Sequence, residues 1–188
     1  MNKQIIRFLQ SVVALPMLAI STPLIGIPTI SVPTVIQNIS KAEDVSVITT
    51  PEDEVRQQQA EAIDSYFASF NSPLEGYGMK FVKEAEKNDI DWRLLPAIAM
   101  RESTGGKKAC KKVSNSVFGY GSCKMSFKSI DHSIEIVATS LGGNNPKTAR
   151  YYDGKTTTQI LRKYNSVIPN YPAEVLGIMK KIENKKNV

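Results

Sequence analysis

The chain contains one histidine and two cysteines among its 188 residues. Zinc sites in proteins are built from three or four His, Cys and carboxylate ligands at characteristic spacings. Side chains of these types are too few here to form a zinc cluster of the usual kind. We therefore expect neither a metal ion nor any other cofactor.

The two cysteines, Cys110 and Cys123, lie close together in the sequence and predict a disulfide in an oxidising compartment. Closing such a loop stabilises a fold by about 3 kcal/mol in the chain-entropy model. The alternative is a nucleophilic thiol, which needs a basic partner. The one histidine, His132, falls on a predicted helix without an Asn or Asp companion, so we favour the disulfide.

The first 42 residues have the pattern of an export signal. Lys3 and Arg7 precede an apolar run over 8–35, and Ser40-Lys41-Ala42 places small residues at both positions that a signal peptidase inspects. The alternative is an uncleaved anchor, because the run is long enough to span a bilayer, although its four prolines disfavour one continuous helix. Either way we expect a secreted or envelope-associated protein outside the cytoplasm.

The whole chain divides into three parts. We interpret 1–42 as a signal peptide or N-terminal membrane anchor, 43–50 as a short linker and 51–186 as one domain. Any membrane contact would come from the anchor alone. No internal repeat is evident, and we expect a monomer.

The formal net charge is +6 at pH 7, which favours an anionic polymer as partner. Bacterial cell wall and nucleic acid are both such polymers. Export argues against nucleic acid, and the basic residues are not interleaved with aromatic ones as in single-strand binding proteins. A solvated, solubilising face explains most of the lysines equally well. Six of them fall close together: Lys107, Lys108, Lys111, Lys112, Lys124 and Lys128.

Hydrophobic periodicity predicts a mainly α (α+β) domain with one small β-hairpin. Thr50-Pro51 supplies an N-cap followed by proline at the first helical position, Ser129 caps a later helix, and Thr156 with Gln159 has the capping-box spacing. The Gly- and Ser-rich stretch from Cys110 to Phe127 predicts a loop leading into the hairpin. The expected helices begin at Thr50, cover 74–87 and 91–103, and then follow Ser129, Thr156 and Pro172.

One carboxyl occupies an unexpected position in the helix predicted over 91–103. Leu95, Ile98 and Ala99 form an apolar stripe at helical spacing, and the next member of that stripe is Glu102. Burial and the negative end of the helix dipole both favour the protonated form of a carboxyl. Such an acid can donate a proton to a glycosidic oxygen. The alternative is a glutamate that pairs with a basic side chain or points into solvent at the helix end.

Several segments together resemble a known family. They are LLPAIAMREST, FGYGSC, the helix SIDHSIEIVATSLGG and a later Tyr-Asn ahead of the final helix. Within Pro73 to Ile182 they resemble bacterial endo-β-N-acetylglucosaminidase (autolysin-type) domains of the lysozyme-like superfamily. The resemblance implies a helical domain with a hairpin lobe that cleaves β-1,4 glycosidic bonds in the glycan strands of peptidoglycan.

The resemblance also assigns roles to individual residues. It implies that Glu102 is the general acid, with Ser103 matching the serine beside it. It places the aromatic-rich hairpin of the cleft at Phe118, Gly119 and Tyr120. Phe118 also fits a core position, because phenylalanine has no polar tip. The resemblance places further substrate contacts at Tyr164, Asn165 and either Tyr151 or Tyr152.

A second catalytic carboxylate is not evident from the sequence. The downstream acids Asp131, Glu135, Asp153 and Glu174 fall in no pattern that marks a base or nucleophile. Without one, the substrate's acetamido group could assist hydrolysis, or its 6-hydroxyl could attack and leave an anhydro sugar, as in a lytic transglycosylase. A wall-binding module without catalytic activity is the alternative outside the enzymes.

Overall fold

The computed structural model describes residues 50–187, which form an all-α fold of seven helices with no strand among them. The predicted signal or anchor over 1–42 and nearly all of the linker over 43–50 lie outside the described residues. No helix in the described part is long and apolar enough to cross a membrane. The helices are α1 (Pro51–Ala68), α2 (Gly78–Lys87), α3 (Leu94–Ser103), α4 (Ile130–Leu141), α5 (Ala149–Tyr152), α6 (Thr157–Tyr164) and α7 (Tyr171–Glu183), followed by a 3-10 turn over Asn184–Asn187.

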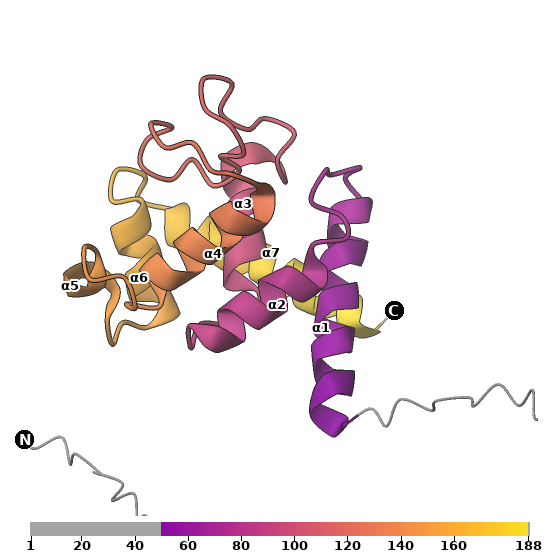
Figure 1. Cartoon of the computed structure of the whole chain (residues 1–188). Helices are drawn as coiled ribbons and strands as arrows, with labels where there is room; N and C mark the ends of the chain where they lie inside the picture. The colour runs from indigo at the N-terminus through magenta and orange to yellow at the C-terminus, as the bar shows by residue number, and fades with distance from the viewer. Residues whose placement is uncertain (1–49, 188) are drawn as a thin grey trace, which may run out of the picture. The chain divides into compact units, whose positions relative to one another are not determined.

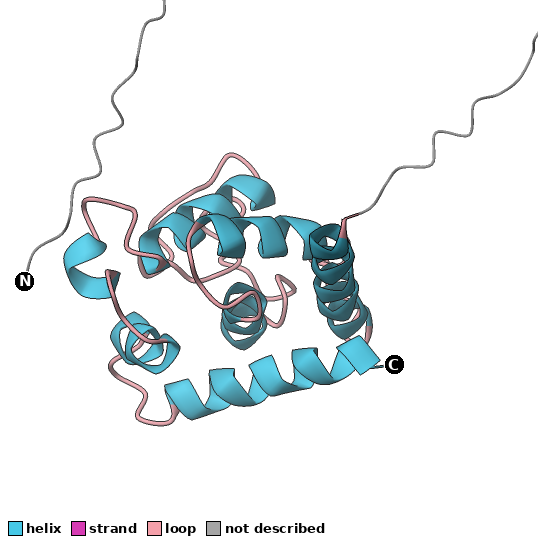
Figure 2. Ribbon diagram, turned by 90° about the horizontal axis from the view of Figure 1, so that it is seen from below, coloured by secondary structure: helices cyan, strands magenta, loops and turns pink. Residues whose placement is uncertain are grey.

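Helix α3 lies at the centre of the described residues. Figure 2 shows it end-on between the other helices, and it packs against α2, α4 and α7. Its buried residues include Leu94, Leu95, Ala97, Ile98 and Ala99, all without exposed surface. The apolar stripe predicted from the sequence is therefore confirmed, and this central position fixes the last turn of α3 relative to the surrounding helices.

The predicted capping signals begin the helices as expected. The Thr50 hydroxyl accepts from the Asp53 amide at the start of α1, and Thr156 with Gln159 forms a capping box at the start of α6. The Ser129 hydroxyl accepts from the amide of His132 and caps α4. Each bond satisfies an amide that the first helical turn leaves without a backbone partner.

Two helices begin later than predicted. The helix expected from Leu74 begins at Gly78, because Asp64 accepts from the amides of Gly76 and Gly78 and holds the preceding residues in a turn. The helix expected from Asp91 begins at Leu94, since the Asp91 carboxylate accepts from the Arg93 amide. Short acidic side chains compete with helix formation in this way. The short helix α5 was not predicted.

The predicted β-hairpin is wrong. Residues 104–129, between α3 and α4, form turns and irregular loop at the top of Figure 1. Asn115, Gly119, Gly121, Ser122 and Cys123 all have positive φ, which interrupts extended strands. The predicted disulfide between Cys110 and Cys123 is confirmed and joins the two arms of this loop.

Candidate active site

Glu102 lies in the last turn of α3, where the buried helix reaches the protein surface. The helix ends at Ser103, the following Thr104 adopts a left-handed conformation, and the amides of Thr104 and Gly105 donate to the carbonyls of Met100 and Ala99. This ending satisfies carbonyls that would otherwise lack partners. The carboxyl of Glu102 is thus attached to a rigid element while its side chain remains partly exposed.

Tyr171, the first residue of α7, holds the carboxyl in place. Its hydroxyl donates to Oε1 of Glu102 at 2.7 Å, and its side chain is completely buried. Burial raises the pKa of Tyr171 far above that of a free tyrosine, and the hydrogen bond to Glu102 raises it further. The phenol therefore remains protonated and acts as a hydrogen-bond donor at any pH near neutrality.

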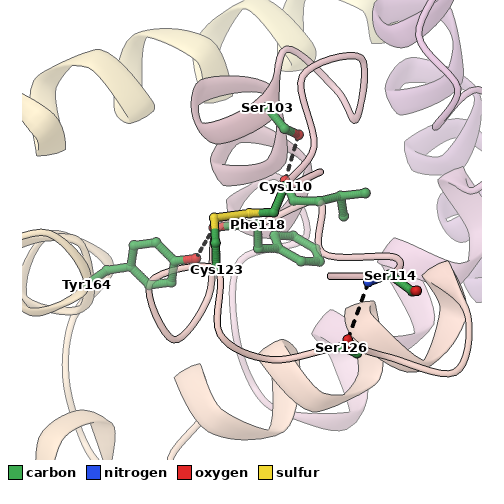
Figure 3. Close-up of a disulfide and its surroundings, with 8 residues drawn as sticks. Ser103, Cys110, Ser114, Phe118, Cys123, Ser126 and Tyr164 are labelled. Atoms are coloured by element: carbon green, nitrogen blue, oxygen red, sulfur yellow. Dashed lines mark hydrogen bonds between the residues drawn. A yellow bond between two sulfur atoms is a disulfide. The ribbon is translucent and has the colours of Figure 1, made fainter. Parts of the chain in front are cut away.

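Two more tyrosines continue the wall beside this pair. The ring of Tyr164 stacks on that of Tyr171 with centroids 6.0 Å apart, and Tyr120 lies 6.4 Å from Tyr164. The Tyr164 hydroxyl donates to the carbonyl of Phe118 at 2.7 Å, which ties α6 to the α3–α4 loop (Figure 3). Burial, followed by the charge of Glu102, raises the pKa of Tyr164 well above its ordinary value.

Glu102 and these tyrosines border a cleft of about 680 Å³. Four of the six predicted substrate-binding residues line it, namely Tyr120, Tyr151, Tyr164 and Asn165. The remaining lining residues are Gly119, Gly121, Ser122, Met125, Thr148, Tyr152, Lys163, Ser166 and Val167. The volume is of the size that small-molecule sites have in proteins.

Ser103 and Phe118 do not line the cleft. Both are buried, and the Ser103 hydroxyl donates to the carbonyl of Val117 at 2.6 Å (Figure 3). The ring of Phe118 packs edge-on against Phe81. These two residues hold the α3–α4 loop against the core, and we do not retain them as substrate contacts.

The backbone of Gly119 lies close to the carboxyl of Glu102, which leaves little room for a side chain at position 119. A Cβ atom built on Gly119 would lie 3.2 Å from Oε2 of Glu102, and the backbone φ of +62° is itself unfavourable for other residues. Glycine at this position leaves the Oε2 face of the carboxyl open.

Asn165 uses only half of its side-chain amide within the protein. Its Oδ1 accepts from the amides of Val167 and Ile168, at 3.2 and 3.1 Å, in the loop after α6. Within the described part of the chain its NH2 group donates to no acceptor in the protein. A hydrogen-bond donor is thus free at the cleft for a polar ligand.

Cations surround Tyr151 at the edge of the cleft. The guanidinium of Arg150 and the ammonium of Lys163 lie 4.6 and 4.2 Å from the centre of its ring. Tyr152 also lines the cleft but is largely buried, and that burial raises its pKa to about 12. Of the two tyrosines between which the sequence could not decide, Tyr151 is the more exposed.

Glu102 is the one acidic residue in the lining of the cleft, as far as residues 50–187 are concerned. Glu174 instead pairs with Arg101, and Glu135 lies 3.9 Å from Lys87. Asp131 and Asp153 do not line the cleft either. Residues 50–187 also contain no group of three His, Cys, Asp or Glu side chains that could hold a metal ion.

Another hollow of about 670 Å³ lies between the start of α1 and the turn after α2. Its two arginines are already paired, Arg56 with Glu86 and Arg93 with Asp91. No unpaired acid or base is directed toward a ligand there, so we place the candidate active site at the Glu102 cleft.

The sequence did not point to Tyr171 or Lys163, and it placed Gly119 at the cleft without showing why glycine is needed there. Tyr171 stands beside Pro172, which marked the helix start, but its contact with Glu102 spans 69 positions along the chain. No pattern within a helix can predict such a contact. Gly119 belongs to the segment FGYGSC, and the repeated glycines of that segment were the signal that its backbone needs a conformation other residues rarely adopt.

No protein-family model matches this chain, and no curated protein matches its sequence.

Proposed function

We propose that the described residues form a lysozyme-like domain that cleaves β-1,4 glycosidic bonds in the glycan strands of peptidoglycan, as an endo-β-N-acetylglucosaminidase. The observation that carries the proposal is a single carboxyl, Glu102, fixed by a buried tyrosine at a cleft walled by tyrosines. Glu102 is the general acid in this proposal.

In this proposal the two oxygens of the carboxyl have different roles. Oε1 accepts from Tyr171, so the proton of the acid form belongs on Oε2, the oxygen next to Gly119. That proton passes to the glycosidic oxygen as the bond to the anomeric carbon breaks, because an unprotonated sugar alkoxide is a poor leaving group. Glu102 is left as a carboxylate, and Tyr171 continues to donate to it.

The absence of another acid in the lining, within residues 50–187, favours a mechanism with one carboxyl. In the hydrolytic route, the neighbouring acetamido oxygen of the substrate attacks the anomeric carbon, and water then opens the resulting ring and restores the acetamido group. The Glu102 carboxylate accepts a proton from that water and returns to its starting form. The same arrangement suits a lytic transglycosylase, in which the 6-hydroxyl attacks in place of water and gives an anhydro sugar.

The walls of the cleft suit an amino-sugar polymer. Tyrosine rings present flat apolar surfaces to the faces of sugar rings, while their hydroxyls can bond to polar groups. The free NH2 group of Asn165 and the ammonium of Lys163 add donors for hydroxyl, carbonyl or carboxylate oxygens of the substrate. The proposed ligand contacts are therefore Tyr120, Tyr151, Tyr164 and Asn165.

The setting that we propose is outside the cytoplasm, secreted or associated with the cell envelope. The disulfide between Cys110 and Cys123 agrees with an oxidising compartment and fixes the loop that forms one wall of the cleft. No cofactor is required by the chemistry described above.

Analysis of the products tests the proposed reaction. Purified peptidoglycan is digested with the protein, and the released sugars are analysed by mass spectrometry before and after borohydride reduction. Reducible N-acetylglucosamine ends support the glucosaminidase, whereas anhydro-muramic ends would replace it by a transglycosylase. Reducible N-acetylmuramic ends would retain a hydrolase but contradict the proposed bond.

A further inference from the structure

The loop between α3 and α4 carries an unusual concentration of positive charge. Residues 105–129 contain six lysines and neither Asp nor Glu. The whole chain has 24 basic and 18 acidic residues, so without these six lysines its basic and acidic residues are equal in number. The entire formal net charge is therefore equal to that of this one loop, which we call the lysine loop.

The charge of the lysine loop is not compensated by the protein. All six ammonium-bearing side chains are exposed, and none forms an ion pair within residues 50–187. Lys107 alone has a protein acceptor there, the carbonyl of Phe70. A solubilising surface usually intersperses both signs of charge, and this one does not.

The fold holds the two arms of the lysine loop next to each other. The disulfide brings the Cα atoms of Cys110 and Cys123 to 5.8 Å. Further along, the Ser114 carbonyl accepts from the Phe127 amide at 3.0 Å, and the Ser114 amide donates to the Ser126 hydroxyl (Figure 3).

These links place the lysines of one arm beside those of the other. Lys111 and Lys112 follow Cys110 on the first arm, and Lys124 follows Cys123 on the second. Like charges repel, so an unlinked loop would allow them to separate. The cross-links instead maintain a dense positive surface whose inner residues, including Tyr120, face the cleft.

The types of side chain on the lysine loop indicate which class of ligand it binds. The six cations are all lysines, which bind phosphates as point charges, whereas paired, planar recognition is characteristic of arginine. The lysine loop exposes no aromatic ring for stacking on nucleic-acid bases, apart from Tyr120 at the cleft. Met125 is its one exposed large apolar side chain, too little for insertion into a bilayer.

We propose that the lysine loop binds a flexible polymer of phosphodiesters, such as a polyol phosphate. The repeating single charges of such a polymer match a cluster of separate lysines, and the polymer has neither bases that need stacking nor acyl chains that need insertion. This binding site is adjacent to the Glu102 cleft but independent of any chemistry there.

Binding of a labelled synthetic poly(glycerol phosphate) to the full chain, followed by fluorescence anisotropy at about 0.1 M salt, where the screening length is about 10 Å, tests the proposal. The loop variant is Lys111→Gln, Lys112→Gln and Lys124→Gln. The matched control is Lys155→Gln, Lys180→Gln and Lys181→Gln, three exposed lysines outside the loop. Both lower the net charge equally, and thermal unfolding confirms that both are folded.

We expect the loop variant to bind about tenfold more weakly or worse, because each lysine beside an anionic polymer strengthens the binding even at this salt concentration. We expect the control to stay within about twofold of the wild type, since charges beyond the screening length contribute little. Binding by the wild type should weaken steeply as salt is added.

Several results would overturn the proposal. One is equal loss in both variants, which would indicate net charge alone, and another is no binding by the wild type. Tighter binding to single-stranded DNA or to anionic phospholipid vesicles would assign the surface to a different class of partner. Glu102→Gln should bind the polymer as the wild type does. A failure of the polymer-binding proposal can therefore be distinguished from a failure of the proposed glycan cleavage.

Discussion

Replacing Tyr171 with phenylalanine should remove the hydrogen bond that supports Glu102, the proposed general acid, while leaving the core filled. The substitution deletes one oxygen, the donor that lies 2.7 Å from Oε1 of Glu102. The ring that stacks on Tyr164 remains. The change therefore isolates the hydrogen bond from the packing.

The expected loss of rate in Tyr171→Phe follows from the strength of a hydrogen bond to a charged group. A hydrogen bond to a charged group contributes about 1.5 to 3 kcal/mol. If that energy serves to orient the carboxyl in the transition state, its loss lowers the rate by about tenfold to about a hundredfold. The reduction should appear in kcat, because Tyr171 is buried behind Glu102 and does not line the cleft.

The assay is the initial rate of release of soluble fragments from purified peptidoglycan over a range of substrate concentrations. Tyr66→Phe is the control, since Tyr66 is also buried but lies on α1 and does not line the cleft. Full activity of Tyr171→Phe, or an effect confined to KM, would refute the positioning role. An equal loss in Tyr66→Phe would attribute the effect to general destabilisation.

Three further predictions concern Gly119, the disulfide and the buried Tyr152. Gly119→Ala should lower both stability, by about 1 to 2 kcal/mol from left-handed backbone strain, and glycan cleavage, because its Cβ would press on Glu102. Gly154→Ala has similar strain with nothing within 4 Å of the new Cβ, so it should lower stability alone, and equal activities in the two variants would contradict the argument. Reducing the disulfide should lower the free energy of unfolding in urea by about 3 kcal/mol, because the unfolded chain regains the entropy that the cross-link removed, and no change would contradict this reasoning. Burial raises the pKa of Tyr152 to about 12, so the folded state keeps a proton that the unfolded state loses above about pH 10. Between those values its contribution should fall by about 1.4 kcal/mol per pH unit, and denaturant titrations of Tyr152→Phe should show a correspondingly smaller alkaline slope or else refute the burial argument.

Local patterns predicted the helices of this chain better than its loops. Caps such as Thr50, Ser129 and Thr156 act within one helical turn, so the sequence alone was sufficient to locate those helix starts. The late starts of α2 and α3 arise from Asp64 and Asp91, whose carboxylates bond to nearby amides in ways that helical periodicity does not reveal.

The candidate site was predicted only in part for a similar reason. Glu102 could be found because a carboxyl interrupts an apolar stripe within a single helix. Tyr171 could not, because its contact depends on how α7 packs against α3. The expected hairpin failed because positive φ at Gly119, Gly121 and neighbouring residues turns the chain where extended strands were predicted.

The most direct test of the account compares the wild type with Glu102→Gln on purified peptidoglycan, measuring fragment release and bound protein in the same samples. Glu61→Gln, an exposed glutamate on α1, controls for the chemical change. We predict that the wild type and Glu61→Gln release fragments, while Glu102→Gln binds the wall but releases none. Equal release by Glu102→Gln would contradict the role of this carboxyl, and binding without release by all three would identify a wall-binding module in place of an enzyme.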